Sequence, residues 1–267
     1  MFAQMKHLAI VSSNVNHEGD FYRDVLGMKR SGLARAGGAV VVRDGYVGLN
    51  LNPRAPGRQA GFDHFGFEVQ DVELVYARFK EKYPSVRVLK RPGNRPFAGI
   101  STHDPAGNVF DLSQAGMENR RDVYLDKDEE MPRRVSHFAL RVLDPDKIGA
   151  FYRDVFELQE LEKPAGDPTH YLSDGKVTLA VMPWQITDFE GSGIERPALD
   201  HIGFKVESMA AVKADLAKHA ETYGPPADDR PEKNSEREIR QKLFAKCCLG
   251  QFQISDPDGV LIDVSES

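Results

Sequence analysis

Two histidines and one aspartate recur at matching positions in two successive parts of the chain, and residues of these types can bind a metal ion. The first set is His7, His64 and Asp111, and the second set is His137, His201 and Asp263. Imidazole and carboxylate groups are costly to bury unless they are bound or hydrogen-bonded, so packing alone does not explain why both parts carry them. Two imidazoles and one carboxylate form the facial triad that binds non-haem Fe(II) and leaves positions open for other ligands. The pattern predicts a metal site, with Fe(II) as the favoured ion and Mn(II) or Zn(II) as alternatives.

A structural role for these histidines is the alternative interpretation. A single histidine on a strand is more often held by hydrogen bonds than bound to a metal, and a recent duplication would copy histidines whether or not they are used. The recurrence of all three ligand types favours the metal interpretation for at least one of the two parts.

The ligands lie within a longer internal repeat, which indicates two tandem domains. Three segments recur: Phe-Tyr-Arg-Asp-Val at 21–25 and 151–155, Asp-His-Phe/Ile-Gly-Phe at 63–67 and 200–204, and Asp-Pro-x-Gly at 104–107 and 256–259. We expect an N-terminal domain at 1–116, a polar linker at 117–134 and a C-terminal domain at 135–267. The second domain carries an insertion near 225–250, which is either a lid beside the site or a surface decoration. A short apolar stripe predicts a helix at 234–246 within it.

Each part is predicted to run in the order strand, helix and further strands, which gives an α+β fold. His7 begins an apolar strand, and the apolar residues that follow recur at helical spacing up to Gly27, a suitable helix cap. Further helices are expected after Asp71, Asp144 and Ser208, which are good N-cap residues. Strands are expected at 7–11, 39–42, 47–51, 62–69 and 109–112 in the first part, and at 177–182, 260–264 and around His137 and His201 in the second.

Composition and charge exclude several classes of protein. The net charge of −6 offers no broad basic field for nucleic acid. No apolar run is long enough for a transmembrane helix, and the first strand pattern begins too early to leave room for a signal peptide. The only cysteines, Cys247 and Cys248, are neighbours and are poorly placed for a structural disulfide. A cytoplasmic location is therefore expected.

The repeated residues resemble the vicinal oxygen chelate superfamily, which includes glyoxalase I, fosfomycin- and bleomycin-resistance proteins and extradiol ring-cleaving dioxygenases. The resemblance rests on the first-strand histidine, the helix motif at 21–27, the Asp-His-Phe-Gly-Phe strand and the Asp-Pro-x-Gly turn before an acidic residue. It covers nearly the whole chain except the linker and the insertion. It implies paired βαβββ modules, each pair curling into a partial barrel around a metal. It also implies the ligand positions His7 and His137 on the first strand, His64 and His201 on the fifth, and Asp111 and Asp263 on the last.

The chain departs from the family pattern at several positions. The family usually has Glu at the last ligand position, where this chain has Asp in both copies. The extradiol pattern has a Tyr shortly before the Asp-Pro turn, where Gln253 and Ser101 stand here, and residues 246–248 replace a further His. Glyoxalase-type sites usually add a carboxylate on the fourth strand, and residues 47–51 and 178–182 offer none. These differences favour a three-ligand oxygen-type site over a glyoxalase site.

Three further residues are candidates for catalytic roles beside the metal. Gln253 precedes the second Asp-Pro turn and is a candidate substrate contact. His170 and Tyr171 could supply a proton or orient a substrate hydroxyl, although a turn histidine and a core tyrosine are the simpler interpretation.

The favoured function is a metal-dependent dioxygenase of extradiol type that acts on a catechol-like or other chelating aromatic substrate with O2. The C-terminal triad is preferred as the working site because its insertion could enclose a substrate and because the resembling enzymes use that domain. Two alternatives stay open: a non-oxidative lyase or isomerase of glyoxalase type, and a non-catalytic protein that binds a small molecule. Self-association is also expected, because it would shield the edges of the sheets.

Overall fold

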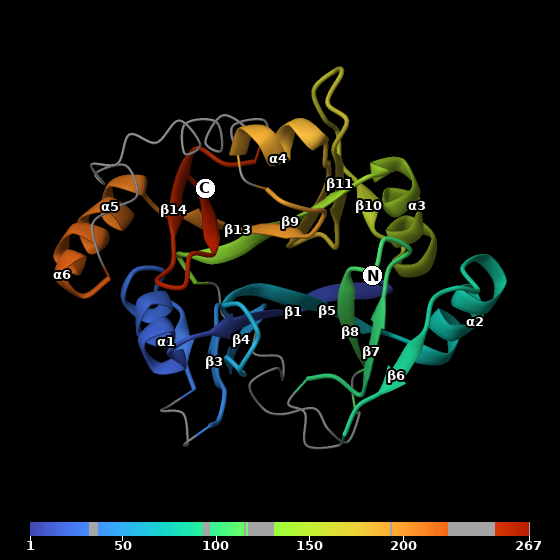
Figure 1. Ribbon diagram of the computed structural model, residues 1–267, viewed down its shortest axis with the longest axis horizontal. Coiled ribbons are helices and arrows are strands. Elements are labelled where there is room, and N and C mark those ends of the chain that lie inside the picture. The colour runs from blue at the N-terminus through green and yellow to red at the C-terminus, as the bar shows by residue number, and fades with distance from the viewer. Residues whose placement is uncertain are drawn as a thin grey trace.

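The computed structural model describes residues 1–31, 37–92, 97–114, 116, 131–192, 194–223 and 249–266. The N-terminal and C-terminal halves each form one sheet with flanking helices, and the two sheets lie one above the other (Figure 1). Most of the expected linker, the helix expected at 234–246, and Cys247 and Cys248 lie outside the described residues.

The N-terminal half is an eight-stranded sheet with the strand order β2-β3-β4-β1-β5-β8-β7-β6. Its strands are β1 (Ala3–Ser12), β2 (Lys29–Arg30), β3 (Val40–Arg43), β4 (Gly48–Pro53), β5 (Gly61–Val69), β6 (Val88–Lys90), β7 (Ile100–His103) and β8 (Val109–Gln114). Its helices are α1 (Val15–Asp24) and α2 (Val72–Lys82). The central strand β1 runs parallel to β4 and antiparallel to β5, so the two βαβββ modules meet at β1 and β5.

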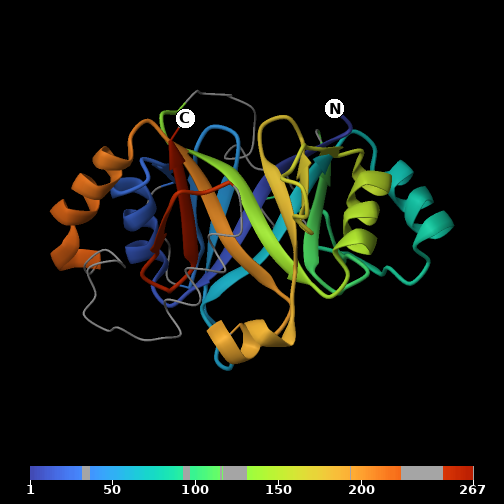
Figure 2. The same ribbon diagram turned by 90° about the horizontal axis from the view of Figure 1, so that it is seen from above.

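The C-terminal half repeats this arrangement in a seven-stranded sheet with the order β10-β11-β12-β9-β13-β15-β14. Its strands are β9 (Arg134–Val142), β10 (Gln159–Glu160), β11 (His170–Ser173), β12 (Thr178–Pro183), β13 (Leu199–Val206), β14 (Phe252–Ser255) and β15 (Leu261–Glu266). Its helices are α3 (Pro145–Phe156), α4 (Ile186–Ser192), α5 (Met209–Lys218) and α6 (Ala220–Tyr223). The α+β class and the tandem arrangement are confirmed, and both sheets curve without closing into a barrel (Figure 2).

The N-cap residues expected from the sequence begin their helices. The side chain of Asp71 accepts hydrogen bonds from two backbone N–H groups of α2, and Asp144 and Ser208 each accept one from α3 and α5. Gly27 follows α1 with a φ of 67°, a left-handed conformation that favours glycine. The short strands β2, β6, β7, β10 and β14 and the short helices α4 and α6 were not expected, because segments this short contain too few residues to show a periodic pattern.

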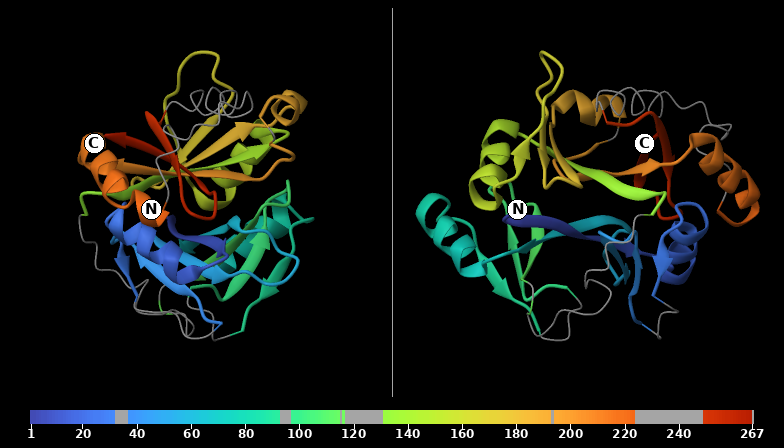
Figure 3. Two further views of the ribbon diagram at one scale, coloured as in Figure 1. Left: turned by 60° about the vertical axis from the view of Figure 1, so that its left-hand side comes forward. Right: turned by 180° about the vertical axis from the view of Figure 1, so that it is seen from behind.

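One hydrophobic core joins the two halves. Alternate residues of β1, such as Leu8 and Ile10, belong to the same buried cluster as Phe138 and Leu140 of β9. Phe65 of β5 contacts Phe138 with ring centroids 4.9 Å apart. Helices α2 and α3 lie side by side at one end of this core (Figure 3). Since side chains alternate along a strand, the other residues of β1 and β9, including both first histidines, lie on the opposite faces of the sheets.

The two halves are also joined by a pair of reciprocal hydrogen bonds from the strand starts. The backbone N–H of Met5 donates to Asp174 at 2.6 Å, and the backbone N–H of Val135 donates to Asp44 at 2.7 Å. Both aspartates belong to the Asp-Gly turns of the repeat, so each turn caps the first strand of the other half.

A second reciprocal pair uses the repeated helix and turn motifs. The hydroxyl of Tyr22 donates to Asp256, and the hydroxyl of Tyr152 donates to Asp104, each at 2.9 Å. Each tyrosine comes from the Phe-Tyr-Arg-Asp-Val motif and each aspartate from the Asp-Pro-x-Gly turn of the other half. These two repeated motifs therefore join the halves to each other.

An extra acid breaks this symmetry next to Tyr22. Glu18 is buried at 1% exposure, and its Oε1 atom has no hydrogen-bond partner among the described residues. Burial, together with the nearby carboxylates of Asp256 and Asp258, raises the pKa of Glu18 well above its ordinary value. Burial raises the pKa of Asp256 as well. The matching position beside Tyr152 is Ile148, which is buried and apolar, so only one of the two tyrosine–aspartate contacts carries the additional carboxyl group.

We expect Glu18→Gln to stabilise the protein increasingly as the pH rises. Because its pKa is raised in the folded state, Glu18 keeps a proton there that the unfolded chain releases above about pH 4.5. Its contribution to stability is full below that pH and is lost as the pH rises towards the folded pKa. Glutamine is neutral at every pH, so the variant should unfold with about 1–3 kcal/mol more free energy at pH 8 and with little difference at pH 4.5.

Urea unfolding between pH 4.5 and 9 measures this difference. Glu81→Gln, at an exposed position of α2, is the matched control and should show no such trend. A stability gain for Glu18→Gln that is equal at all pH values would contradict the proposed proton retention.

Candidate metal centres

The N-terminal candidate ligands come together on the face of the sheet that points away from the shared core. The Nε2 atoms of His7 on β1 and His64 on β5 are 3.2 Å apart. Asp111 Oδ2, on β8, is 3.3 Å from His64 Nε2 and 4.0 Å from His7 Nε2. Three ligand atoms from three adjacent strands thus converge on one point, as a divalent ion requires.

Neighbouring side chains hold these three ligands in place. Asp63 Oδ2 is 2.7 Å from Nδ1 of His64, which fixes the ring so that Nε2 faces the other ligands. The hydroxyl of Ser101 on β7 donates to Oδ1 of Asp111 and leaves Oδ2 for the ion. The ring of Phe97 stacks on His7 with centroids 4.7 Å apart. Such outer contacts orient metal ligands in general, and here every ligand has one.

The charges of the N-terminal group suit a cation. Burial and the neighbouring His64 together lower the pKa of His7 to about 3, so His7 is neutral. Burial opposes the charged form of His64, but hydrogen bonds to Asp111 and Asp63 outweigh it and raise the pKa to about 9. Burial also opposes ionisation of Asp111, yet the His64 contact prevails and lowers the pKa of this carboxyl group. A positive charge between these ligands is therefore stabilised.

A cavity of about 570 Å³ opens directly onto the N-terminal ligands. All three ligands line it, and His64 and Asp111 are 18% and 13% exposed. Beside the ligands, the cavity wall combines apolar residues, among them Leu89, Phe97 and Val109, with a set of polar residues: Asn50, Asn52, Arg58, Asp63, Arg91 and Ser101. This volume lies within the range of small-molecule sites in proteins.

The C-terminal candidate ligands form the same geometry. The Nε2 atoms of His137 on β9 and His201 on β13 are 3.2 Å apart, and Asp263 Oδ2 on β15 is 3.4 Å from His137 Nε2. Asp200 Oδ2 lies 2.9 Å from His201 Nδ1, and Ser136 Oγ lies 3.1 Å from His137 Nδ1. The two triads are the clusters of at least three possible metal ligands in the described part of the chain.

Gln253 orients the last ligand of this second triad. Its side-chain N–H donates to Asp263 Oδ1 at 2.9 Å, the role that Ser101 has in the first triad. Asp263 Oδ2 is buried and has no hydrogen-bond partner among the described residues. Burying a carboxylate oxygen without a partner is costly, so this oxygen beside two imidazoles fits a site for a bound cation.

The C-terminal triad is nevertheless more deeply buried than the N-terminal one, although His137 lines a separate cavity. Its histidines and aspartate are 0–1% exposed. Strand β4 pairs with β1 in the same register in which β12 pairs with β9. The positions of Asn50 and Asn52 on β4 are therefore taken by Ala180 and Met182 on β12. These two apolar residues cluster with Ala139, Tyr171, Leu161 and Leu249. The face that is open and polar in the N-terminal half is therefore filled by apolar side chains here.

The backbone of Gly250 closes the triad further. A Cβ atom at this residue would lie 1.7 Å from both carboxylate oxygens of Asp263. Residues 249 and 250 end the expected insertion, and the rest of it, which was expected as a lid, lies outside the described residues.

The other two candidate catalytic residues do not join the triad. His170 lies between α3 and β10, with its ring nitrogens 2.7 Å from Asp146 of α3 and 2.6 Å from Glu160 of β10. Tyr171 belongs to the apolar cluster and donates its hydroxyl to Asp167 at 2.9 Å. The structure gives both residues structural partners, which differs from the expected roles in proton supply or substrate orientation.

One part of the contrast between open and closed ligands is visible in the sequence. The signal is the fourth strand, where Asn50 and Asn52 stand at alternate positions in the first half and Ala180 and Met182 stand in the second. The geometry thus favours the N-terminal triad for contact with a substrate, whereas the insertion and the domain used by the resembling enzymes favoured the C-terminal triad.

The family follows from a sequence match that covers both halves. The model of the Glyoxalase/Bleomycin resistance protein/Dioxygenase superfamily matches residues 4–112 and again residues 134–264. The chain belongs to this superfamily. The resemblance expected from the repeated motifs is thereby confirmed, and each match contains one of the two triads. No functionally curated protein is detectably similar in sequence.

Several solved structures share the fold of the whole chain. Homoprotocatechuate 2,3-dioxygenase from Arthrobacter globiformis superposes with a TM-score of 0.66 at 17% identity, covering 100% of this chain and 80% of that one. The 2,3-dioxygenase LapB from a Pseudomonas species gives 0.64 at 16% identity, with 99% and 92% covered. The Mn(II)-bound glyoxalase from Novosphingobium aromaticivorans gives 0.63 at 17% identity, with 99% and 82% covered. At these identities the likeness establishes the fold alone. Among the described residues, no helix is long and apolar enough to cross a membrane.

Proposed function

We propose that this superfamily member is a metal-dependent dioxygenase of the extradiol ring-cleaving type and that its N-terminal triad is the working site. The observation that carries the proposal is a three-ligand group that opens onto a cavity of about 570 Å³. Fe(II) is the proposed ion, and a catechol-like aromatic molecule that chelates through two adjacent oxygens is the proposed substrate. The structural likeness to 2,3-dioxygenases supports the same reaction class.

Fe(II) held by His7, His64 and Asp111 would supply positions at which a chelating diol and O2 meet. The residues of the chain position and shield this site. Asp63 holds His64, Ser101 holds Asp111, and the stacked ring of Phe97 covers one side of His7.

The polar residues of the cavity wall would orient the substrate. Asn50 donates its side-chain N–H to Asn52 at 3.2 Å, while its buried Oδ1 has no partner among the described residues. That free oxygen is available to accept a hydrogen bond from a substrate hydroxyl. Arg58 pairs with Asp63, whereas Arg91 lines the cavity from the segment that follows β6. Arg91 therefore provides a positive charge for an acidic or strongly polar substituent.

A glyoxalase-type lyase or isomerase is the second candidate, and Asn50 is the observation that favours it. Its free Oδ1 lies on the fourth strand, where glyoxalase-type sites usually have a carboxylate, and it lines the same cavity as the triad. An amide oxygen is a possible additional ligand for Mn(II). In that case the metal would polarise a carbonyl group without using O2.

Metal content and oxygen uptake of the same preparation test the proposal. Protein purified without oxygen should bind iron and should consume one O2 for each catechol cleaved, with a ring-opened product visible by absorbance. Turnover of a methylglyoxal–thiol adduct without O2 uptake would instead establish the glyoxalase-type reaction. Failure to bind any metal after anaerobic loading would refute both reactions and leave a protein that only binds small molecules.

A further inference from the structure

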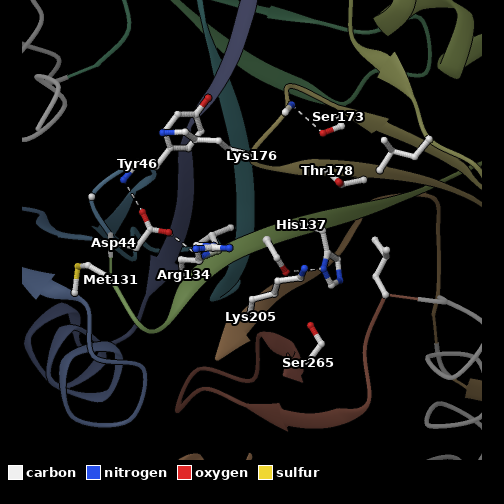
Figure 4. A pocket seen from close by; sticks show the side chains of 16 residues that line it. Asp44, Tyr46, Met131, Arg134, His137, Ser173, Lys176, Thr178, Lys205 and Ser265 are labelled. Atoms are coloured by element: carbon white, nitrogen blue, oxygen red, sulfur yellow. Dashed lines mark hydrogen bonds between the residues drawn. The ribbon is translucent and has the colours of Figure 1, made fainter. Parts of the chain in front are cut away.

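A second cavity, of about 490 Å³, lies between the two halves and away from the N-terminal triad. Figure 4 shows Asp44 and Tyr46, from the turn between β3 and β4, facing the strands of the C-terminal half. His137 lies at the opposite side of the cavity, next to Lys205 of β13 and Ser265 of β15. The N-terminal catalytic proposal makes no use of this cavity.

The internal repeat explains why a cavity exists at this place. Lys6 precedes His7 in the first half, and Ser136 precedes His137 in the second. Glu68 of β5 corresponds in the same way to Lys205 of β13. Lys6 and Glu68 are buried, at 3% and 8% exposure, whereas Lys205 is exposed. At the corresponding place the N-terminal half has two long, buried side chains of opposite charge, and the C-terminal half has a short hydroxyl and a single cation instead.

The lining of this cavity is positively charged. Arg134, Lys176 and Lys205 contribute cations, and Asp44 is the only carboxylate among the lining residues. Burial raises the pKa of Asp44, and its two oxygens accept the backbone N–H groups of Tyr46, Val47 and Val135 at 2.7–2.8 Å. The carboxylate of Asp44 is thus used by the turn and by the contact between the halves. The lining therefore has three cationic side chains and one carboxylate, which is already hydrogen-bonded.

The remaining lining is divided between hydroxyl groups and apolar surface. Ser136, Thr178 and Ser265 supply hydroxyl groups close to His137, and Leu161, Leu249 and Met131 supply apolar surface. Cations and hydroxyl donors favour a carboxylate, and the apolar wall favours a hydrocarbon body attached to it.

We propose that this cavity binds a small organic carboxylate with an apolar body, such as an aromatic acid. Its carboxylate lies near Lys205, Ser136 and Ser265, and its ring lies against Leu161 and Leu249. The bound acid is then adjacent to the Ser136–His137 contact that supports the closed C-terminal triad. The proposal is independent of the reaction at the N-terminal site.

Binding of benzoate and of its neutral isostere benzamide, measured by calorimetry, tests the inference. The wild-type protein should bind benzoate at least about 10-fold more tightly than benzamide, because charge-assisted hydrogen bonds are worth more than neutral ones. The double variant Ser136→Lys/Lys205→Glu installs the residue pair of the N-terminal half and should lose benzoate binding by about 10-fold or more.

Two further variants make the result decisive. Lys205→Gln alters an exposed side chain, so it should fold normally, and it should weaken benzoate binding while leaving benzamide binding unchanged. Lys218→Glu, a charge reversal on α5 outside the cavity lining, should leave both unchanged. Equal affinity for benzoate and benzamide in the wild-type protein, or unaltered benzoate binding in Lys205→Gln and in the double variant, would overturn the proposal.

Discussion

His64→Ala is expected to reduce the turnover of catechols by about 10³-fold or more, whereas His201→Ala should retain most of it. His64 lines the open cavity and provides one of three possible ligand atoms, so its loss should remove both the proposed metal and the place where the proposed substrate meets it. His201 is fully buried within the closed triad, and its loss should act mainly on stability. The measurements are steady-state oxygen uptake, metal content for each chain and thermal unfolding of both variants.

His219→Ala, at the end of α5 and outside both triads, is the control for histidine removal in general. It should keep full metal content and full activity. The converse pattern, in which His201→Ala is inactive and His64→Ala is active, would transfer the reaction to the C-terminal triad. Metal content shows whether the loss of activity in His64→Ala comes from loss of the ion, because this variant should bind one ion fewer than the wild-type protein.

The positions of both triads followed from the sequence because they depend on local rules. A histidine at the start of an apolar strand, a second in the Asp-His-Phe-Gly-Phe strand and an aspartate after a turn each have a defined place in a repeated module. Alternation along β1 puts His7 on one face and Leu8 on the other, and the structure brings the ligand atoms together as that pattern predicts.

Access to each triad did not follow, because it depends on residues far apart in the sequence. Whether a triad is open is decided by side chains of the fourth strand and by backbone that arrives from a later segment. Gly250 reaches Asp263, and Met182 and Leu249 meet in one apolar cluster. No periodic pattern encodes such long-range contacts, although the exchange of Asn52 for Met182 was visible as a change of polarity.

Recurrence of a motif in both halves is not by itself evidence for a chemical role. Two of the most similar segments of the repeat, around Tyr22 and Tyr152, serve the contact between the halves through reciprocal bonds to Asp256 and Asp104. A repeated motif in a tandem protein can therefore persist because each copy binds the other. The histidines instead meet each other and an aspartate within their own half, and this convergence of possible ligand atoms favours metal binding as the account of their recurrence.

Gly203→Ala is expected to destabilise the protein by about 2–4 kcal/mol and to empty the C-terminal metal site. Gly203 of β13 lies directly opposite His137 of β9. A Cβ atom there would lie 1.9–2.3 Å from three atoms of the imidazole ring, far inside any tolerable contact. The ring would have to leave its position between Ser136 and His201, and a buried imidazole would lose its partners. Urea unfolding and metal content measure the two consequences.

The same substitution in a His137→Ala background should cost far less than in the wild-type chain, because the ring that the new methyl group strikes is then absent. The free energy of coupling between the two substitutions, obtained from all four proteins, should be at least about 1.5 kcal/mol. Additive costs would mean that the glycine is needed for the backbone of β13 itself. A large coupling energy would instead show that Gly203 is needed to make room for the ring of His137. Unchanged catechol turnover in Gly203→Ala would show that the C-terminal site takes no part in the proposed reaction at the N-terminal one.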